Sequence, residues 1–408
     1  MAGAAGDTRP GPVLRLGAAV KGAVLAAPLF FSGAAVAMAE GTTIPDHLEA
    51  ISFGELGGWA DDDHREALHA FLRLCGKPLP QGAETAFPRI APKDLQELCT
   101  EAAAAASGPA GAARRFLERR FTPYRVRRNG FVTGYFEPEL EASREPAADF
   151  PVPLHKKPAG LETVSPANRP AGWPEHLSHG RRLGETLVEM PDRGAIMDGA
   201  LDAEKLELVW LNDPVDAFLV HVQGSARLRL TDGSVMRVGY AGKTGHPYTG
   251  IARLLVTRGE GTPEDFTMSG LKAWLQARPE ERDALMRENR SYIFFREVTD
   301  IGPDAGPVGA AGVPLTAGRS LAVDPAHISY GSLVFVSSGF RDAGTGTPFA
   351  RLMVADDTGS AIRGPARGDI FVGSGSAAGE IAGEIRHPAE FTLLVPGLPP
   401  SGDAAPGE

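Results

Sequence analysis

The sequence has only two cysteines in 408 residues, 7% aromatic residues and no long basic run. After residue 39 it has no apolar run near the roughly 18 residues that a membrane-spanning helix needs. Its 41 Lys and Arg against 51 Asp and Glu give a net charge of −10, so it lacks the electrostatic footprint of a nucleic-acid-binding protein. Two cysteines without adjacent histidines cannot form a four-ligand zinc site, and we expect no metal.

The first 39 residues have the pattern of a signal peptide. Three basic residues precede an uncharged stretch over residues 22–39, which ends in Ala-Met-Ala, a typical signal-peptidase site. We expect cleavage after Ala39 and an exported, soluble, periplasmic protein. The alternative is an N-terminal membrane anchor, which Pro28 disfavours. No cysteine lies near the cleavage site to carry a lipid, so association with the outer membrane would need another anchor.

The two cysteines, Cys75 and Cys99, both lie in helical patterns. Export to an oxidising compartment would let them pair, so we expect a disulfide that joins two helices. Two separately buried thiols are the alternative. The first of these helices is expected to begin after Asp61 or Asp62.

The chain changes character after its first third. Residues 40–120 predict mostly helices, and from Thr122 the apolar residues alternate as they do in strands. Asp232-Gly233 separates two alternating runs, which predicts a hairpin. Six short strands near the C-terminus have the spacing of a barrel or sandwich. Residues 399–408 are expected to be disordered.

Motifs for cofactors fail on inspection. Gly242-Lys243-Thr244 resembles the end of a phosphate-binding loop but lacks the required leading glycine. Residues 373–378 match a loose dinucleotide-binding pattern, yet too little chain follows for that fold. No cofactor is therefore expected.

Three aspartates near the C-terminus remain as candidates for chemistry. Asp324, Asp357 and Asp369 each lie at a strand end or in the adjacent turn, where a barrel can gather distant residues. Carboxyl groups in an exported protein without a cofactor suggest acid and base catalysis on a polymer such as a glycan. The alternative is that each aspartate only orders a turn.

Several sequence motifs resemble the membrane-bound lytic transglycosylase A family. They are AVDP, ADDTGSAIRG and RGDIFVG near the C-terminus and, upstream, VTGYFEPEL, VQGSARLRLTDG, GHPYTGIARLL and ENRSYIFFR. The resemblance runs from about Phe131 to Pro396. It implies cleavage of the β-1,4 bond between N-acetylmuramic acid and N-acetylglucosamine in peptidoglycan. The muramic acid 6-hydroxyl would close on C1 to give a 1,6-anhydro product.

This chemistry needs one carboxyl group, which protonates the leaving oxygen and then takes the proton of the 6-hydroxyl. The family pattern assigns that role to Asp369, with Asp357 as the rival and otherwise as the group that tunes it. Asp324 would take part directly or order the cleft wall. Asp356 is disfavoured, because neighbours on a strand point to opposite faces. Thr133 could hydrogen-bond the catalytic carboxyl group.

The resemblance also implies a mainly β fold with a helical N-terminal part. Residues 40–135 and 290–398 would form a double-psi β-barrel, residues 136–289 an inserted β-rich domain, and a groove between them would hold the glycan. The expected ligand contacts are Tyr135, Glu137, Gln223, Gly224, Ser225, His246, Tyr248, Tyr292 and Gly359.

The chain departs from the family pattern at Ala226, Thr244 and Ser360, which leaves every candidate acid in place. Two other functions stay open: an inverting glycan hydrolase, and a peptidoglycan-binding module without activity. The expected partners are peptidoglycan glycan strands and proteins of cell-wall synthesis or hydrolysis, and the expected state is a monomer.

Overall fold

The computed structural model describes residues 44–80, 82–302 and 305–397. The expected signal peptide, residues 1–39, and the expected disordered tail, residues 399–408, lie outside the described residues. The described chain is mainly β, with a helical N-terminal part, as the sequence predicts.

The helical part covers the chain before the first long strands. Its helix α1 begins after Asp63, whose carboxylate accepts hydrogen bonds from the backbone N–H groups of Arg65 and Glu66. The predicted caps Asp61 and Asp62 were therefore wrong by one or two residues. The elements are β1 (Leu48–Ala50), η1 (Phe53–Glu55), η2 (Trp59–Asp61), α1 (His64–Leu72), α2 (Pro92–Ala106) and α3 (Ala112–Arg120).

One disulfide and the ion pairs of one buried arginine hold these helices in place. Cys75, just after α1, forms a disulfide with Cys99 of α2, with 5.8 Å between the Cα atoms. The buried guanidinium of Arg319 lies 2.9 Å from Asp62 Oδ1 and 2.9 Å from Glu66 Oε2. The apolar faces of the helices share one core with barrel residues such as Phe335. The helices therefore pack against the barrel.

The largest sheet closes on itself. Its order is β1-β2-β17-β14-β15-β13-β16-β3, and β17 also pairs with β3, so six strands form a closed ring. The six strands of the ring are β3 (Gly130–Glu137), β13 (Ser320–Ala322), β14 (Leu333–Arg341), β15 (Pro348–Asp357), β16 (Arg367–Ser374) and β17 (Arg386–Pro396), and β2 (Phe121–Val126) pairs with β17 outside it.

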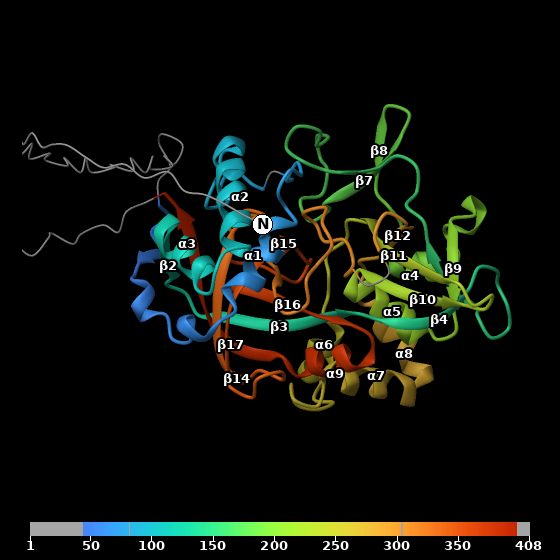
Figure 1. Cartoon of the computed structure of the whole chain (residues 1–408). Coiled ribbons are helices and arrows are strands. Elements are labelled where there is room, and N and C mark those ends of the chain that lie inside the picture. Colours follow the sequence, from blue (N-terminus) through green and yellow to red (C-terminus); the bar gives the residue numbers. More distant parts are fainter. Residues whose placement is uncertain (1–43, 81, 303–304, 398–408) are drawn as a thin grey trace, which may run out of the picture. The chain divides into compact units, whose positions relative to one another are not determined.

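Strands from both ends of the described chain build this barrel. Figure 1 shows the teal strand β3 beside the red strands β16 and β17. The pairs β3–β16 and β13–β15 are parallel and the other pairs of the ring are antiparallel. This mixture is consistent with the double-psi barrel that the family resemblance implies. The strands enclose a core of Val132, Leu321, Ile370 and other apolar side chains.

A second sheet follows where β3 runs into β4 (Figure 1). Its order is β12-β11-β10-β4-β9-β5, and a bridge between Lys156 and Phe295 connects its two edges. The hairpin predicted at Asp232-Gly233 is confirmed as the β10–β11 pair. The strands are β4 (Glu139–Ser143), β5 (Val152–His155), β9 (Glu207–Leu211), β10 (Ser225–Leu230), β11 (Val235–Lys243) and β12 (Ile293–Glu297).

The end of the inserted part differs from the expected boundary. The sequence assigns residues 290–398 to the barrel, but β12 pairs with β11 in the second sheet. Phe295 of β12 packs in the core of that sheet. A boundary after Glu297 accounts for this pairing. Ile293, Phe294 and Phe295 are consecutive apolar residues, and such a run does not show from the sequence which core it enters.

A small third sheet and further helices complete the described chain. In the described ranges, no helix has the length and apolar character needed to cross a membrane. The remaining elements are β6 (Leu161–Thr163), β7 (His179–Leu183), β8 (Thr186–Val188), α4 (Arg193–Met197), η3 (Asp202–Glu204), α5 (Pro214–Gln223), α6 (Ile251–Arg258), α7 (Met268–Ala277), α8 (Pro279–Arg287) and α9 (Ser376–Glu384).

We predict that replacing both cysteines, Cys75→Ala with Cys99→Ala, lowers the free energy of unfolding by about 2–4 kcal/mol, because the disulfide restricts the unfolded chain. The cysteines are 24 positions apart. Urea unfolding of the oxidised wild type and of the double variant measures the difference. Equal unfolding midpoints would show that the disulfide adds no stability.

Candidate active site

The predicted aspartates meet in one register row of the barrel. Strand β13 lies between β15 and β16, and its Ala322 pairs with Asp357 on one side and with Asp369 on the other. Asp369 in turn pairs with Thr133 of β3. Since neighbouring strands lie about 4.8 Å apart, the backbones of the two aspartates are about 10 Å apart. Residues far apart in sequence therefore form one line across four strands.

This row lies on the face of the sheet away from the barrel core. Ile370 and Val132, which follow Asp369 and precede Thr133, are buried in the core. Side chains alternate between the faces of a strand, so Asp369 and Thr133 point outward. Both are partly exposed. The carboxyl group is thus within reach of a ligand.

Asp369 has the electrostatics of an acid that can exchange a proton near neutral pH. Burial raises the pKa of Asp369 to about 6, against hydrogen bonding from Thr133 and the charge of Arg367, and the charge of Asp357 adds to the rise. The Thr133 hydroxyl donates to Asp369 Oδ1 and accepts a hydrogen bond of 2.8 Å from Arg367 Nη2. Among the described residues, no group hydrogen-bonds Oδ2 of Asp369. That oxygen is free to meet a ligand.

Asp357 is held much more firmly. Its Oδ2 accepts a hydrogen bond of 2.6 Å from the Tyr135 hydroxyl, and its Oδ1 accepts one of 2.9 Å from the backbone N–H of Ala310. Burial raises the pKa of Asp357, opposed by these hydrogen bonds. With both oxygens occupied, Asp357 is better placed to influence Asp369 than to exchange a proton with a ligand.

Asp356 and Asp324 have contacts that order the barrel. Asp356 is 1% exposed and accepts a hydrogen bond of 2.6 Å from the Ser320 hydroxyl, at a register shift where β15 has one extra residue. Burial raises the pKa of Asp356 well above its usual range. Asp324 is also buried, and its two oxygens accept from the backbone N–H groups of Ala326 and Gly364. Asp324 thereby ties the chain after β13 to the chain before β16.

Two predicted aromatic contacts lie near this row. Tyr135 hydrogen-bonds Asp357, and its ring lies 5.4 Å from the Phe371 ring. Tyr248 is partly exposed, and burial raises its pKa, with Arg193 opposing and Asp369 adding to the rise. Tyr248 is therefore within electrostatic range of Asp369.

The predicted Gln223-Gly224-Ser225 motif connects the second sheet to β3. Gln223 Oε1 accepts a hydrogen bond of 3.0 Å from the backbone N–H of Phe136. Gly224 has a φ of +80° and ends α5, a conformation that glycine adopts most readily. Ser225 is buried at the start of β10. The motif therefore ties the junction of α5 and β10 to the end of β3, where the chain leaves the barrel.

Glu137 is fully buried, so the structure gives no support for a contact between this residue and a ligand. Its Oε1 lies 2.9 Å from Arg237 Nε, its Oε2 lies 3.6 Å from Arg227 Nη2, and Ser374 donates a hydrogen bond of 2.8 Å to Oε2. Burial raises the pKa of Glu137, against these partners. The contacts join β3 and β16 of the barrel to β10 and β11 of the second sheet.

His246 and Tyr292 are also buried, within the inserted part. His246 Nε2 lies 2.9 Å from the Met190 carbonyl oxygen, and the Tyr292 hydroxyl lies 2.7 Å from His155 Nδ1. Both order the segment that carries Tyr248, because His246 lies two residues before it and the backbone N–H of Thr244 donates to the Tyr292 carbonyl oxygen. Gly359 is partly exposed in the loop directly after Asp357, where an added Cβ would lie 3.1 Å from Ile362.

Sequence reasoning missed Arg367 and Ala310. Arg367 holds the Thr133 hydroxyl, and its signal was its place two residues before Asp369 on the same strand face. Ala310 contributes only a backbone N–H, which no sequence pattern marks. The described residues contain no group of three or more His, Cys, Asp or Glu side chains that could hold a metal ion.

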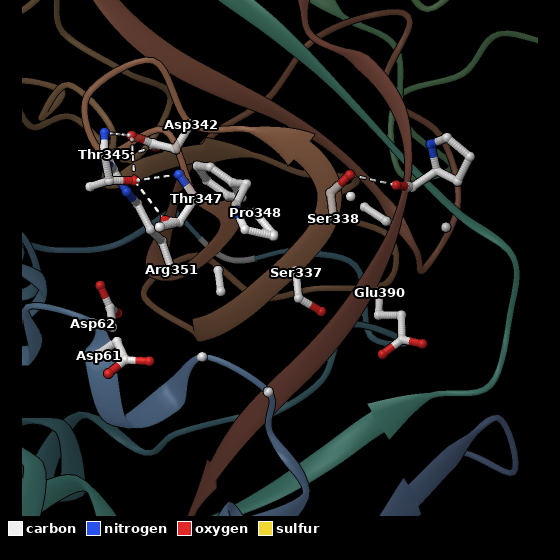
Figure 2. A pocket seen from close by; sticks show the side chains of 18 of the residues that line it. Asp61, Asp62, Ser337, Ser338, Asp342, Thr345, Thr347, Pro348, Arg351 and Glu390 are labelled. Atoms are coloured by element: carbon white, nitrogen blue, oxygen red, sulfur yellow. Dashed lines mark hydrogen bonds and ion pairs between the residues drawn. The ribbon is translucent and has the colours of Figure 1, made fainter.

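A cavity of about 1550 Å³ lies elsewhere on the barrel, beside the start of β15 and the end of β14. Figure 2 shows Asp342 joined by hydrogen bonds to Thr345, with Asp61 and Asp62 across the cavity. None of the predicted site residues lines it. Its acidic groups include Asp62, which pairs with Arg319, and Asp342, which pairs with Arg351. We assign it no part in the site.

A closed barrel with a long insertion after β3 defines the class of protein. Residues 131–296 match the MltA specific insert domain, and residues 319–395 match the 3D domain. The crystal structure of a membrane-bound lytic murein transglycosylase from Agrobacterium tumefaciens is similar, with 41% identity over 86% of this chain and 97% of that chain and a TM-score of 0.78.

Two further relatives extend the comparison. The Escherichia coli K12 protein named membrane-bound lytic murein transglycosylase A is 32% identical over 268 residues, which is 64% of each chain. The structure of E. coli MltA with bound chitohexaose has 25% identity over 82% of this chain and 90% of that chain, with a TM-score of 0.59. The chain belongs to the MltA family, as its motifs suggested.

We predict that Asp369→Asn stabilises the protein above pH 6 and not below pH 4. The folded pKa of about 6 exceeds the usual 3.8, so the folded state binds the proton more tightly than the unfolded state, and this advantage is lost as pH rises through 6. Above pH 6 the partly buried carboxylate therefore destabilises the folded state, by about 1–2 kcal/mol after allowance for its partial exposure. The neutral amide of Asn removes this destabilisation.

Thermal unfolding at pH 4 and pH 8 measures this difference, with the exposed Asp61→Asn as a control. A stabilisation that is the same at both pH values would contradict a raised pKa for Asp369.

Proposed function

We propose that the protein is a lytic transglycosylase that cleaves the β-1,4 bond between N-acetylmuramic acid and N-acetylglucosamine in peptidoglycan. The observation that carries the proposal is the outward-facing Asp369, with a pKa of about 6 and one unoccupied oxygen among the described residues. The names of the relatives support the substrate class, and the bound chitohexaose of E. coli MltA supports binding of a β-1,4-linked glycan.

In the proposed reaction Asp369 acts twice. Its protonated carboxyl group gives a proton to the glycosidic oxygen as the bond from C1 to that oxygen breaks. The resulting carboxylate then takes the proton of the muramic acid 6-hydroxyl as the 6-oxygen bonds to C1. The products are a 1,6-anhydro end and a free N-acetylglucosamine 4-hydroxyl, and Asp369 is protonated again. No water is consumed, because the nucleophile belongs to the same sugar.

The neighbours of Asp369 would adjust this cycle. The Thr133 hydroxyl stabilises the carboxylate between the two proton transfers, and the charge of Asp357 keeps the pKa of Asp369 high enough for the first transfer. Tyr248 would offer its ring to a sugar. Asp324 would act by ordering the loop that follows Asp357.

An inverting hydrolase on the same row is the second candidate. The spacing of about 10 Å between the backbones of Asp357 and Asp369 leaves room for a water molecule between their carboxyl groups. The hydrogen bonds at both oxygens of Asp357 favour the transglycosylase, since they stabilise its carboxylate and make it a weaker base. The third candidate function is a peptidoglycan-binding module without catalytic activity.

We also propose that the enzyme works outside the cytoplasm, with the glycan in a groove between the barrel and the inserted sheet. The disulfide between Cys75 and Cys99 supports an oxidising compartment. The hydrogen bond between Gln223 of the inserted part and Phe136 of β3 supports such a groove, because it holds the inserted part against the barrel.

We predict that Asp369→Asn lowers the rate of peptidoglycan cleavage about a thousandfold, because the other outward carboxyl group of the row, Asp357, is held by hydrogen bonds at both oxygens. Mass spectrometry of muropeptides released from sacculi should show anhydro ends from the wild type and from the control Asp61→Asn. Hydrolysed ends, heavier by one water, would favour the hydrolase. Binding to sacculi without any product would favour the binding module.

We predict that Thr133→Val moves the alkaline limb of the pH profile of kcat/KM to higher pH. The hydroxyl donates to the charged form of Asp369, so its loss disfavours the carboxylate and raises the pKa above about 6. Thr133→Ser keeps the hydroxyl and should keep the wild-type limb. A limb that stays or moves to lower pH in Thr133→Val would contradict this role.

A further inference from the structure

A lysine of the inserted sheet reaches the barrel loop that follows Asp357. Lys243 ends β11, and its ammonium group donates a hydrogen bond of 3.1 Å to the Ser360 hydroxyl. Ser360 is three residues after Asp357, so their Cα atoms are at most about 11 Å apart. Lys243 is partly exposed. A cation from the inserted part is thus held beside the candidate active site.

Two further cations lie near this lysine. The exposed Lys157 lies along Gly242, where a carbon of its side chain would be 3.4 Å from an added Cβ. Burial lowers the pKa of Lys243, and the charge of Arg363 lowers it further. Burial lowers the pKa of His179 to about 4, with Lys243 and Lys157 adding to the effect. These groups are therefore within electrostatic range of one another.

We call Lys157, Lys243 and Arg363 the cationic cluster. Within the described ranges, Lys157 and Lys243 form no ion pair, and Arg363 has only Asp324, at 3.5 Å. The chain as a whole has more acidic than basic residues, so two neighbouring lysines without a paired carboxylate are unusual here. Their mutual repulsion would be relieved by an anionic ligand.

In the substrate proposed above, an anionic group occurs at one position of the repeating disaccharide. The alternating sugars of peptidoglycan are neutral except at the lactyl ether of muramic acid. That ether ends in a free carboxylate or in an amide-linked peptide with its own carboxylates. A strand bound at Asp369 would bring this substituent near the loop around Ser360, because the cluster and Asp357 adjoin the same loop.

We propose that the cationic cluster binds a carboxylate carried by the lactyl substituent of muramic acid, and so selects substituted glycan strands over neutral ones. This proposal rests on the proposed function for its ligand. Lys243 supplies the central charge, and Ser360 holds its ammonium group toward the loop. Lys157 and Arg363 add to this charge and, being exposed, can follow a flexible substituent.

Binding measured in the Asp369→Asn background tests the proposal without turnover. Three probes differ in charge: glycan strands with peptides, strands from which an amidase has removed the peptides to leave lactyl carboxylates, and neutral chitohexaose. Lys243→Met should weaken binding of at least one carboxylate-bearing probe about tenfold and leave chitohexaose unchanged. Raising the salt concentration should weaken wild-type binding of the same probe. Lys77→Met removes an equally charged exposed lysine and should change nothing.

The two carboxylate-bearing probes distinguish the source of the charge. A loss confined to peptide-bearing strands identifies the peptide carboxylates, and a loss on both kinds of strand identifies the lactyl position. Equal weakening for chitohexaose would overturn the proposal in favour of a purely structural lysine, and unchanged binding of all probes would also overturn it. These binding measurements do not depend on catalysis. Failure of the proposed reaction would instead appear in the cleavage assay, as undiminished cleavage by Asp369→Asn.

Discussion

The hydrogen bond from Thr133 to Asp369 joins the two segments that the insertion separates, and the candidate site depends on it. Thr133 lies on β3, before the inserted sheet, and Asp369 lies on β16, after it. Parallel pairing of these strands puts both side chains in one outward-facing row. The surroundings raise the pKa of the carboxyl to about 6, while the hydroxyl keeps its charged form accessible. A proton can therefore move both ways near neutral pH.

The buried ion pair of Glu137 with Arg237 holds the second sheet against this row. Glu137 ends β3, and its partners come from the second sheet and from Ser374 of β16. Removing one member of such a pair leaves an uncompensated buried charge, so the arrangement resists displacement. The orientation of the inserted sheet is thus set within a few residues of Thr133. Lys243 approaches the loop after Asp357 from the same sheet.

The family resemblance implied the barrel and its insertion, and local sequence patterns predicted single elements. Asp232-Gly233 between alternating runs predicted the β10–β11 hairpin, and three motifs predicted the aspartates of the barrel. Tertiary contacts decided the rest. Glu137 was expected to contact a ligand because it lies in the VTGYFEPEL motif. No sequence pattern reveals that its side chain is buried against Arg237. The sequence assigned Ile293–Glu297 to the barrel, but its pairing with β11 places it in the second sheet, and its consecutive apolar residues gave no local signal for either core.

The central claim is that the pKa of Asp369 lies near 6, since the proposed double proton transfer depends on it. Carbon-13 NMR of the side-chain carboxyl, recorded from pH 3 to pH 9 and assigned with Asp369→Asn, measures this pKa directly. The account predicts a midpoint close to pH 6. A midpoint near pH 4, typical of an exposed aspartate, would contradict it.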